Sequence, residues 1–90
     1  MISVEDIRKS MRISHNASDG EISRDMDAAR LDMNRAGIDE KKDNALIDKA
    51  IELYCKAQFD YLGKGEQFQK AYDKLIDSIA LSEEYRCGTS

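Results

Sequence analysis

Two helical patterns meet at a glycine break in residues 46–81, which read LIDKAIELYCKAQFDYLGKGEQFQKAYDKLIDSIAL. In the first pattern, apolar residues fall on nearly every side of a predicted helix that we place at residues 44–62. In the second, they recur every three or four residues from Phe68 to Ile79. A short turn at Gly63-Lys64-Gly65 between two long apolar faces predicts an antiparallel helical hairpin.

Two further helices are predicted upstream of the hairpin. Ser3 and Asp6 resemble a capping box, and they open a short helix that ends near Met11. Ser18 and Glu21 form a fuller version of the same motif at the start of a helix that runs to about residue 36. The expected core face of this second helix consists of Ile22, Met26, Ala29 and Met33.

The end of the second helix has its own signal. Gly37 stands where a helix C-cap needs positive φ, and Ile38 can make the apolar contact that accompanies such a cap. No segment alternates between apolar and polar residues as a strand does. We therefore expect an all-α fold: a small four-helix domain over residues 1–82, with a long antiparallel C-terminal hairpin. Residues 83–90, which have no apolar period, are expected to form a mobile C-terminal tail.

Length and composition limit the possible classes of protein. A chain of 90 residues forms one domain, and a domain of this size buries only about 60–65% of its unfolded surface. We therefore expect the third helix, apolar on several sides, to need a neighbouring chain to cover it. Charged residues make up 36% of the chain and hydrophobic residues 41%, with no Pro and no Trp, which favours a soluble helical protein.

Charge is spread evenly along the chain. Residues 1–45 hold 8 basic and 10 acidic side chains, residues 46–90 hold 6 and 8, and the net charge is -4. This balance offers no basic face for phosphates, so we expect any DNA to pass by without being gripped. The opening MISVEDIRKSM lacks the apolar core of a signal peptide, and no run is long enough to span a membrane.

Several residues suggest chemistry, but each has a plainer reading. His15 and Asp19 are too few for a metal site. Cys55 and Cys87 lack CxxC spacing and are read as reduced thiols, with Cys55 a small core residue. The Gly63-Lys64-Gly65 turn lacks the strand and the glycine spacing of a phosphate-binding loop. We therefore predict no catalytic residues, no metal, no cofactor and no enzymatic activity.

Aromatic residues divide into core and contact candidates. Tyr54, Tyr61, Phe68 and Tyr72 have helical spacing on faces that are expected to be buried. Phe59 falls on the opposite side of the third helix, which favours packing on the first helices or on a neighbouring subunit. Tyr85 and Arg86 lie beyond the last periodic residue. The candidate residues for a subunit or portal interface are therefore Phe59, Tyr85 and Arg86.

Nearly the whole chain resembles the small head-tail connector family of long-tailed bacteriophages, often described as DNA-packaging proteins. The specific blocks are YCKAQF (54–59) and FQKAY (68–72), supported by the opening MISVEDIRKSMRI, by DMNRAGI (32–38) and by ALSEEY (80–85). The charged linker DEKKDNA (39–45) departs from the family, so a function placed in a longer loop there does not carry over.

The resemblance implies a small α-helical protein without catalytic residues. It implies a homo-oligomeric ring of about a dozen copies beneath the portal protein, which continues the DNA channel towards a downstream neck, stopper or tail-completion protein. The protein would be made in the cytoplasm of the host bacterium and located in the neck of the virion.

A helix-turn-helix DNA-binding regulator is the alternative, because residues 59–75 contain two helical patterns about a glycine turn. It is less favoured because its second helix offers only Lys70 and Lys74 as cations. These are set against three acidic residues, Glu66, Asp73 and Asp77.

Overall fold

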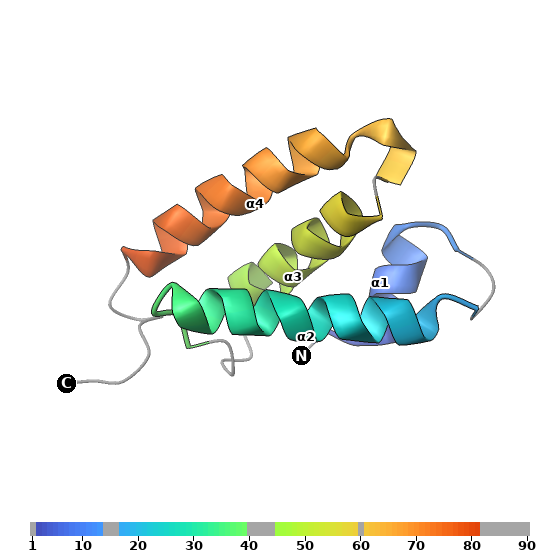
Figure 1. Ribbon diagram of the computed structural model, residues 1–90, viewed down its shortest axis with the longest axis horizontal. Helices are drawn as coiled ribbons and strands as arrows, with labels where there is room; N and C mark the ends of the chain where they lie inside the picture. The colour runs from blue at the N-terminus through green and yellow to red at the C-terminus, as the bar shows by residue number, and fades with distance from the viewer. Residues whose placement is uncertain (1, 14–16, 40–44, 60, 82–90) are drawn as a thin grey trace.

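The computed structural model describes residues 2–13, 17–39, 45–59 and 61–81, and the regular structure within these ranges is entirely helical (Figure 1). The elements are α1 (Val4–Ser10), α2 (Asp19–Arg35), α3 (Ala45–Gln58), a short 3-10 turn η1 (Tyr61–Gly63) and α4 (Gly65–Ala80). The predicted all-α class is confirmed. The expected tail, residues 83–90, lies outside the described residues.

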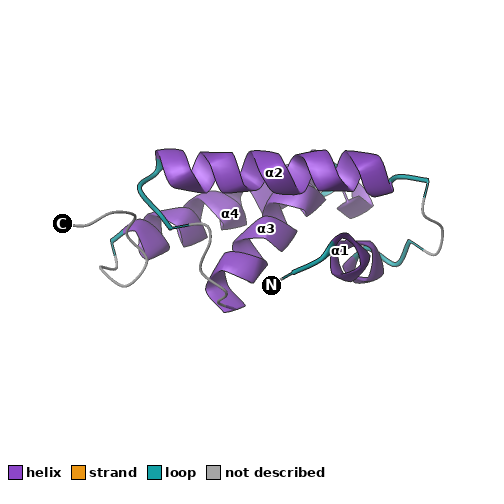
Figure 2. Cartoon of the chain, turned by 90° about the horizontal axis from the view of Figure 1, so that it is seen from below, coloured by secondary structure: helices purple, strands orange, loops and turns teal. Residues whose placement is uncertain are grey.

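Helix α3 lies at the centre of the arrangement. It contacts α1, α2 and α4, and α4 runs back beside it after the η1 turn (Figure 1). Figure 2 shows α2 lying across the molecule, with α1 below the N-terminal half of α2. The radius of gyration is 12.9 Å, close to the value of about 12 Å expected for a compact domain of this length.

The predicted capping box of α1 is confirmed. The Ser3 hydroxyl accepts a hydrogen bond from the Asp6 N–H at 3.2 Å, and the Asp6 carboxylate accepts one from the Ser3 N–H at 3.0 Å. The backbone bond from Ser3 is the main reason that the pKa of Asp6 is lowered. Ile7 and Met11 then bury one side of α1 in the core.

Helix α2 ends as the sequence predicts. Gly37 has φ +84°, and its N–H donates to the Asn34 carbonyl at 3.0 Å. The N–H of Ile38 donates to the Met33 carbonyl at 2.9 Å, which completes a Schellman motif. Ile38 is fully buried. The expected core face of α2 is also buried throughout: Ile22, Met26, Ala29 and Met33.

The predicted capping box at the start of α2 is wrong. Ser18 precedes the helix, but its side chain makes no capping hydrogen bond. Its backbone, at φ -99° and ψ 7°, is not in the extended region from which a capping side chain reaches the first turn. The next residue, Asp19, instead places its Oδ1 atom 3.2 Å from Nε of Arg8, so an ion pair joins the start of α2 to α1.

Helix α3 ends at Gln58, earlier than the predicted end at residue 62. Leu62 has φ +58°, a left-handed conformation that cannot continue an α-helix. Aromatic packing continues beyond the helix end. The ring centroids of Tyr61 and Phe68 lie 6.1 Å apart. Nζ of Lys56 lies 5.5 Å and 5.7 Å from those two centroids, within cation–π range.

Most of α3 is covered without a neighbouring chain, because three helices of the same chain surround it. The buried residues of α3 lie on several of its sides and are Ile47, Ala50, Ile51, Leu53 and Cys55. Leu46, near the start of the helix, is 43% exposed. Contact of α3 with a neighbouring chain stays a prediction.

Polar contacts also connect helices that are distant in sequence. The Tyr72 hydroxyl on α4 donates to Oδ2 of Asp32 on α2 at 2.7 Å. The Tyr72 ring meets Tyr54 of α3 edge to face, with centroids 5.2 Å apart and an interplanar angle of 68°. The N–H of Ile2 donates to Oδ1 of Asp48 on α3 at 3.2 Å. Tyr72 thus contacts both neighbours of α4.

Candidate interaction surface

The structure describes one of the three residues predicted to form a subunit or portal interface. Phe59 is half-buried and packs against the core of its own chain. This agrees with the intrachain option for Phe59, while a role between subunits stays a prediction. Tyr85 and Arg86 lie outside the described residues, and their role also stays a prediction.

Chemical sites are not favoured by the residues that the structure describes. Among them, no group of His, Cys, Asp or Glu side chains could hold a metal ion. Cys55 is fully buried, as predicted for a small core residue. Burial raises the pKa of its thiol to about 12, with a smaller contribution from the negative charge of Asp25, so the thiol stays protonated at neutral pH. His15 and Cys87 lie outside the described residues.

None of the helices that the structure describes is both long and apolar enough to cross a bilayer. Helices α2 and α4 each carry exposed residues along one side, while their buried residues face the core. The residues on their outward faces are therefore the ones to consider.

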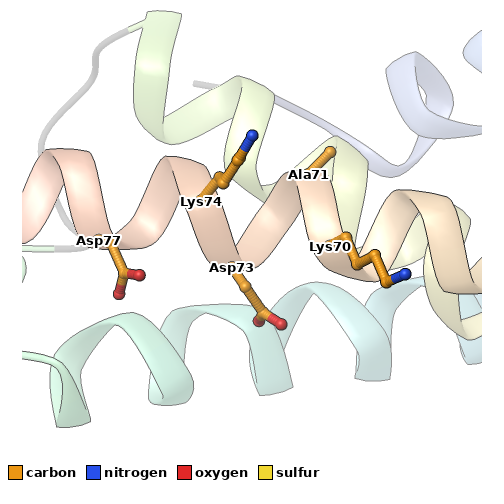
Figure 3. A pocket seen from close by; sticks show the side chains of 5 residues that line it. All are labelled: Lys70, Ala71, Asp73, Lys74 and Asp77. Carbon is orange, nitrogen blue, oxygen red and sulfur yellow. The ribbon is translucent and has the colours of Figure 1, made fainter.

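The outward face of α4 carries a shallow depression. Figure 3 shows its five lining side chains, all exposed: Lys70, Ala71, Asp73, Lys74 and Asp77. Four of these residues are at positions i, i+3, i+4 and i+7, which is the set that forms a hole for a side chain of a facing helix. Aliphatic lysine stems and the Ala71 methyl line this hole, while two ammonium and two carboxylate groups surround it.

Ala71 is one of the apolar residues that recur every three or four residues from Phe68 to Ile79, but it is exposed and lies outside the core face of α4. The core face centres on Tyr72, Ile76 and Ile79, which are buried. Ala71 is about 100° away from Tyr72 around the helix, at the edge of the apolar arc. A helical projection would have shown this position, but the small size of alanine leaves its burial undecided in a sequence.

Four large apolar side chains are exposed among the residues that the structure describes, namely Leu31, Leu46, Leu62 and Leu81. Single exposed leucines are common and need no special explanation. Leu31 differs in its setting: it is 71% exposed and lies within a regular helix, one turn before the end of α2. One turn before it is Asp27 and one turn after it is Arg35, whose side chains are 76% and 80% exposed. Sequence reasoning did not single out Leu31.

The charges on both outer faces are weakly engaged within the chain. Asp27 lies 3.9 Å from Arg30, Arg35 lies 3.2 Å from Asp32, and Lys70 lies 3.6 Å from Glu66. Exposed pairs of this kind contribute about 0–1 kcal/mol. Lys74 and Asp77 make no ion pair with any residue in the described ranges. These side chains can therefore re-pair with an incoming partner at little cost.

Comparison of the chain with protein-family models, with curated proteins and with solved structures gives no match. The connector resemblance therefore rests on the sequence blocks quoted above. The geometry adds one fact about those blocks: they pack on each other. Tyr54 of the first block meets Tyr72 of the second, and Lys56 of the first lies over the ring of Phe68 in the second.

Proposed function

We propose that this protein is a structural head-tail connector of a bacteriophage or prophage. In this role, copies of the chain form a ring under the portal protein and extend the DNA channel towards the downstream neck, stopper or tail-completion protein. The observation that carries the proposal is the pair of blocks YCKAQF and FQKAY. The role needs neither a catalytic residue nor a cofactor, and it places the protein in the virion neck after synthesis in the host cytoplasm.

The packing of the two blocks gives their joint occurrence a physical reason. Their aromatic residues form the contact between α3 and α4, so a change in one block would disturb the other. We propose that this α3–α4 hairpin is the rigid unit of each subunit. The outer helices and the tail, with Tyr85 and Arg86, would then supply the contacts to neighbouring copies and to the portal.

A ring also places a demand on the subunit surface, because each copy must present two different faces to its two neighbours. The outward faces of α2 and α4 are different, and both combine an apolar element with charges of both signs. Such mixed surfaces suit contacts that form during assembly more than a permanent apolar interface.

The charge distribution fits a channel component better than a DNA-binding regulator. The net charge of the chain is -4, so its overall charge repels the DNA backbone. The exposed face of α4 balances Lys70 and Lys74 with Asp73 and Asp77. A recognition helix needs an excess of cations to neutralise phosphates. A mobility-shift assay with nonspecific duplex at low salt separates the two: we expect no retention, and clear micromolar retention would favour the regulator.

Electron microscopy of the assembled neck tests the proposal directly. Particles carrying a tagged copy of the chain should show it as a closed ring around the channel axis, between the portal and the tail. Particles made without the chain serve as the control and should lack that layer. A monomeric or twofold decoration away from the axis would refute the connector function.

A further inference from the structure

We propose that neighbouring copies meet through α2 of one and α4 of the next, with Leu31 seated in the depression formed by Lys70, Ala71, Asp73, Lys74 and Asp77. This inference rests on the ring of the proposed function and names its subunit contact. The occupant of the depression is a second copy of this chain, packed with the two helices parallel.

The shape argument starts from Leu31. A leucine that projects from a regular helix is the usual knob of helix–helix packing, and the four residues at i, i+3, i+4 and i+7 of a facing helix are its hole. Leu31 is 71% exposed with no covering element in the described chain. The hole on α4 is also exposed, and the lysine stems and the Ala71 methyl give it an apolar part between the charged groups. Seating one in the other removes apolar surface from water on both sides.

The charges fix the direction of packing. On α2, Asp27 and Arg35 each lie four residues from Leu31, so they stand about 6 Å before and after it along the helix. On α4, Lys70 and Asp77 lie about 5 Å before and after the centre of the hole. With the helices parallel, Asp27 faces Lys70 and Arg35 faces Asp77. With the helices antiparallel, both pairs would bring like charges together.

This contact is heterologous, because the outer face of α2 meets the outer face of α4 and not a second α2. Each copy keeps a free α4 face at one end and a free α2 face at the other. Repetition of a heterologous contact closes into a ring when the rotation per subunit allows it, and otherwise continues as a helical filament. The proposed contact thus supplies the repeat that the ring requires.

Photo-cross-linking of the unmodified sequence tests the contact. Copies in which photo-leucine replaces leucine are mixed with copies carrying heavy isotopes, irradiated at high protein concentration, and analysed by mass spectrometry. We expect heavy-to-light cross-links from position 31 to residues 70–77. Leu62 and Leu81, 70% and 79% exposed, are built-in controls of equal chemistry. Position 31 should reach this segment at least about fivefold more often than either control does.

Charge exchange tests the orientation. Asp27→Lys should lower the cross-link yield at least about fivefold, because it places two ammonium groups together. Adding Lys70→Glu to the same chain should restore the yield, whereas adding Asp77→Lys should not. Circular dichroism of each variant verifies that the monomer is folded. An unchanged or higher yield in Asp27→Lys overturns the parallel arrangement, because antiparallel packing would set the introduced ammonium group opposite the Asp77 carboxylate. A yield that Lys70→Glu does not restore overturns it as well.

The same irradiation on assembled particles separates this inference from the function on which it rests. Cross-links from position 31 that are no more frequent than those from the two controls, in solution and in particles, overturn the α2–α4 contact even when microscopy finds the chain in the neck. Cross-links to a different protein in place of residues 70–77 overturn it as well. Microscopy without a ring on the axis refutes the connector function, whatever the cross-links show.

Discussion

Replacing Tyr72 with phenylalanine removes one hydroxyl group and leaves the rest of the core in place. That hydroxyl donates to Oδ2 of Asp32 at 2.7 Å and so makes a polar contact between α4 and α2. Tyr72 is 2% exposed, so its ring stays packed in the variant, including its edge contact with Tyr54. The change therefore isolates the hydrogen bond from the packing.

The expected loss of stability follows from the charge of the hydrogen-bond acceptor, Asp32. A hydrogen bond to a charged group contributes about 1.5–3 kcal/mol to stability. The Asp32 side chain is 38% exposed, so water can replace the lost donor, which places the expected cost near the lower limit of about 1.5 kcal/mol. For a domain of this size, that cost corresponds to a fall in Tm of about 6–12 °C.

Urea unfolding at neutral pH measures this difference, with Tyr54→Phe as the matched control. Tyr54 shares the aromatic contact but does not donate to Asp32, so its variant should change stability by less than about 0.5 kcal/mol. If Tyr72→Phe and Tyr54→Phe unfold at the same urea concentration as the wild type, the bond between α4 and α2 is not formed as described.

Alkaline pH gives a second measurement of the same site. Burial, and then the hydrogen bond to Asp32, raise the pKa of Tyr72 above its usual 10.0. The unfolded chain therefore loses this proton first, and the stability that Tyr72 contributes is full below about pH 10 and is lost above it. Wild type should lose about 1.4 kcal/mol more per pH unit than Tyr72→Phe does above this pH. A constant gap between the two proteins would contradict the assignment.

Three further changes test other parts of the structure. Cys55→Ala should reduce the loss of stability at alkaline pH, because the folded thiol, with a pKa of about 12, keeps its proton above the ordinary pKa of 9.0. In urea unfolding between about pH 8 and 10, the stability of the wild type should fall more steeply than that of the variant, by about 1.4 kcal/mol per pH unit above the ordinary pKa. Parallel curves for the two proteins would refute this. Ser3→Ala should cost about 1 kcal/mol in urea unfolding and Ser18→Ala almost nothing, because only Ser3 makes a capping bond; equal costs would contradict the asymmetry. Removal of residues 83–90 should leave the melting temperature unchanged, because the buried core lies within residues 7–79. The same truncation should abolish attachment to portal-bearing heads. A truncated chain that still attaches to heads would exclude Tyr85 and Arg86 as the anchors.

Local signals predicted the helices well because the physics that produces them is local. The capping box at Ser3 and the left-handed Gly37 each involve residues within one or two turns. The periodic core face of α2 likewise follows from helix geometry alone. In each case, the sequence contains both partners of the interaction within a few residues, so a pattern is sufficient.

The failures have several causes. Ser18 has the spacing of a capping box, but the ion pair between Arg8 and Asp19 connects the start of α2 to α1. Helix α3 ends at Gln58, and Leu62 has a left-handed backbone, although the apolar pattern continues to residue 62. The candidate surface was missed because an exposed leucine is identifiable only when the face that covers the core is known.

The coverage of α3 changes the physical basis of the proposed ring. An apolar helix left open would drive strong association of free copies, whereas here most of the large apolar residues of α3 are buried by its own chain. The surfaces that remain, on α2 and α4, bury one leucine between mixed charges, and an interface of that size is weak in isolation. In a ring, each copy makes this contact twice, and a portal holds the copies at high local concentration. On the proposed function, the free protein is therefore a monomer in dilute solution and the ring forms on its template, because only there do several weak contacts close together.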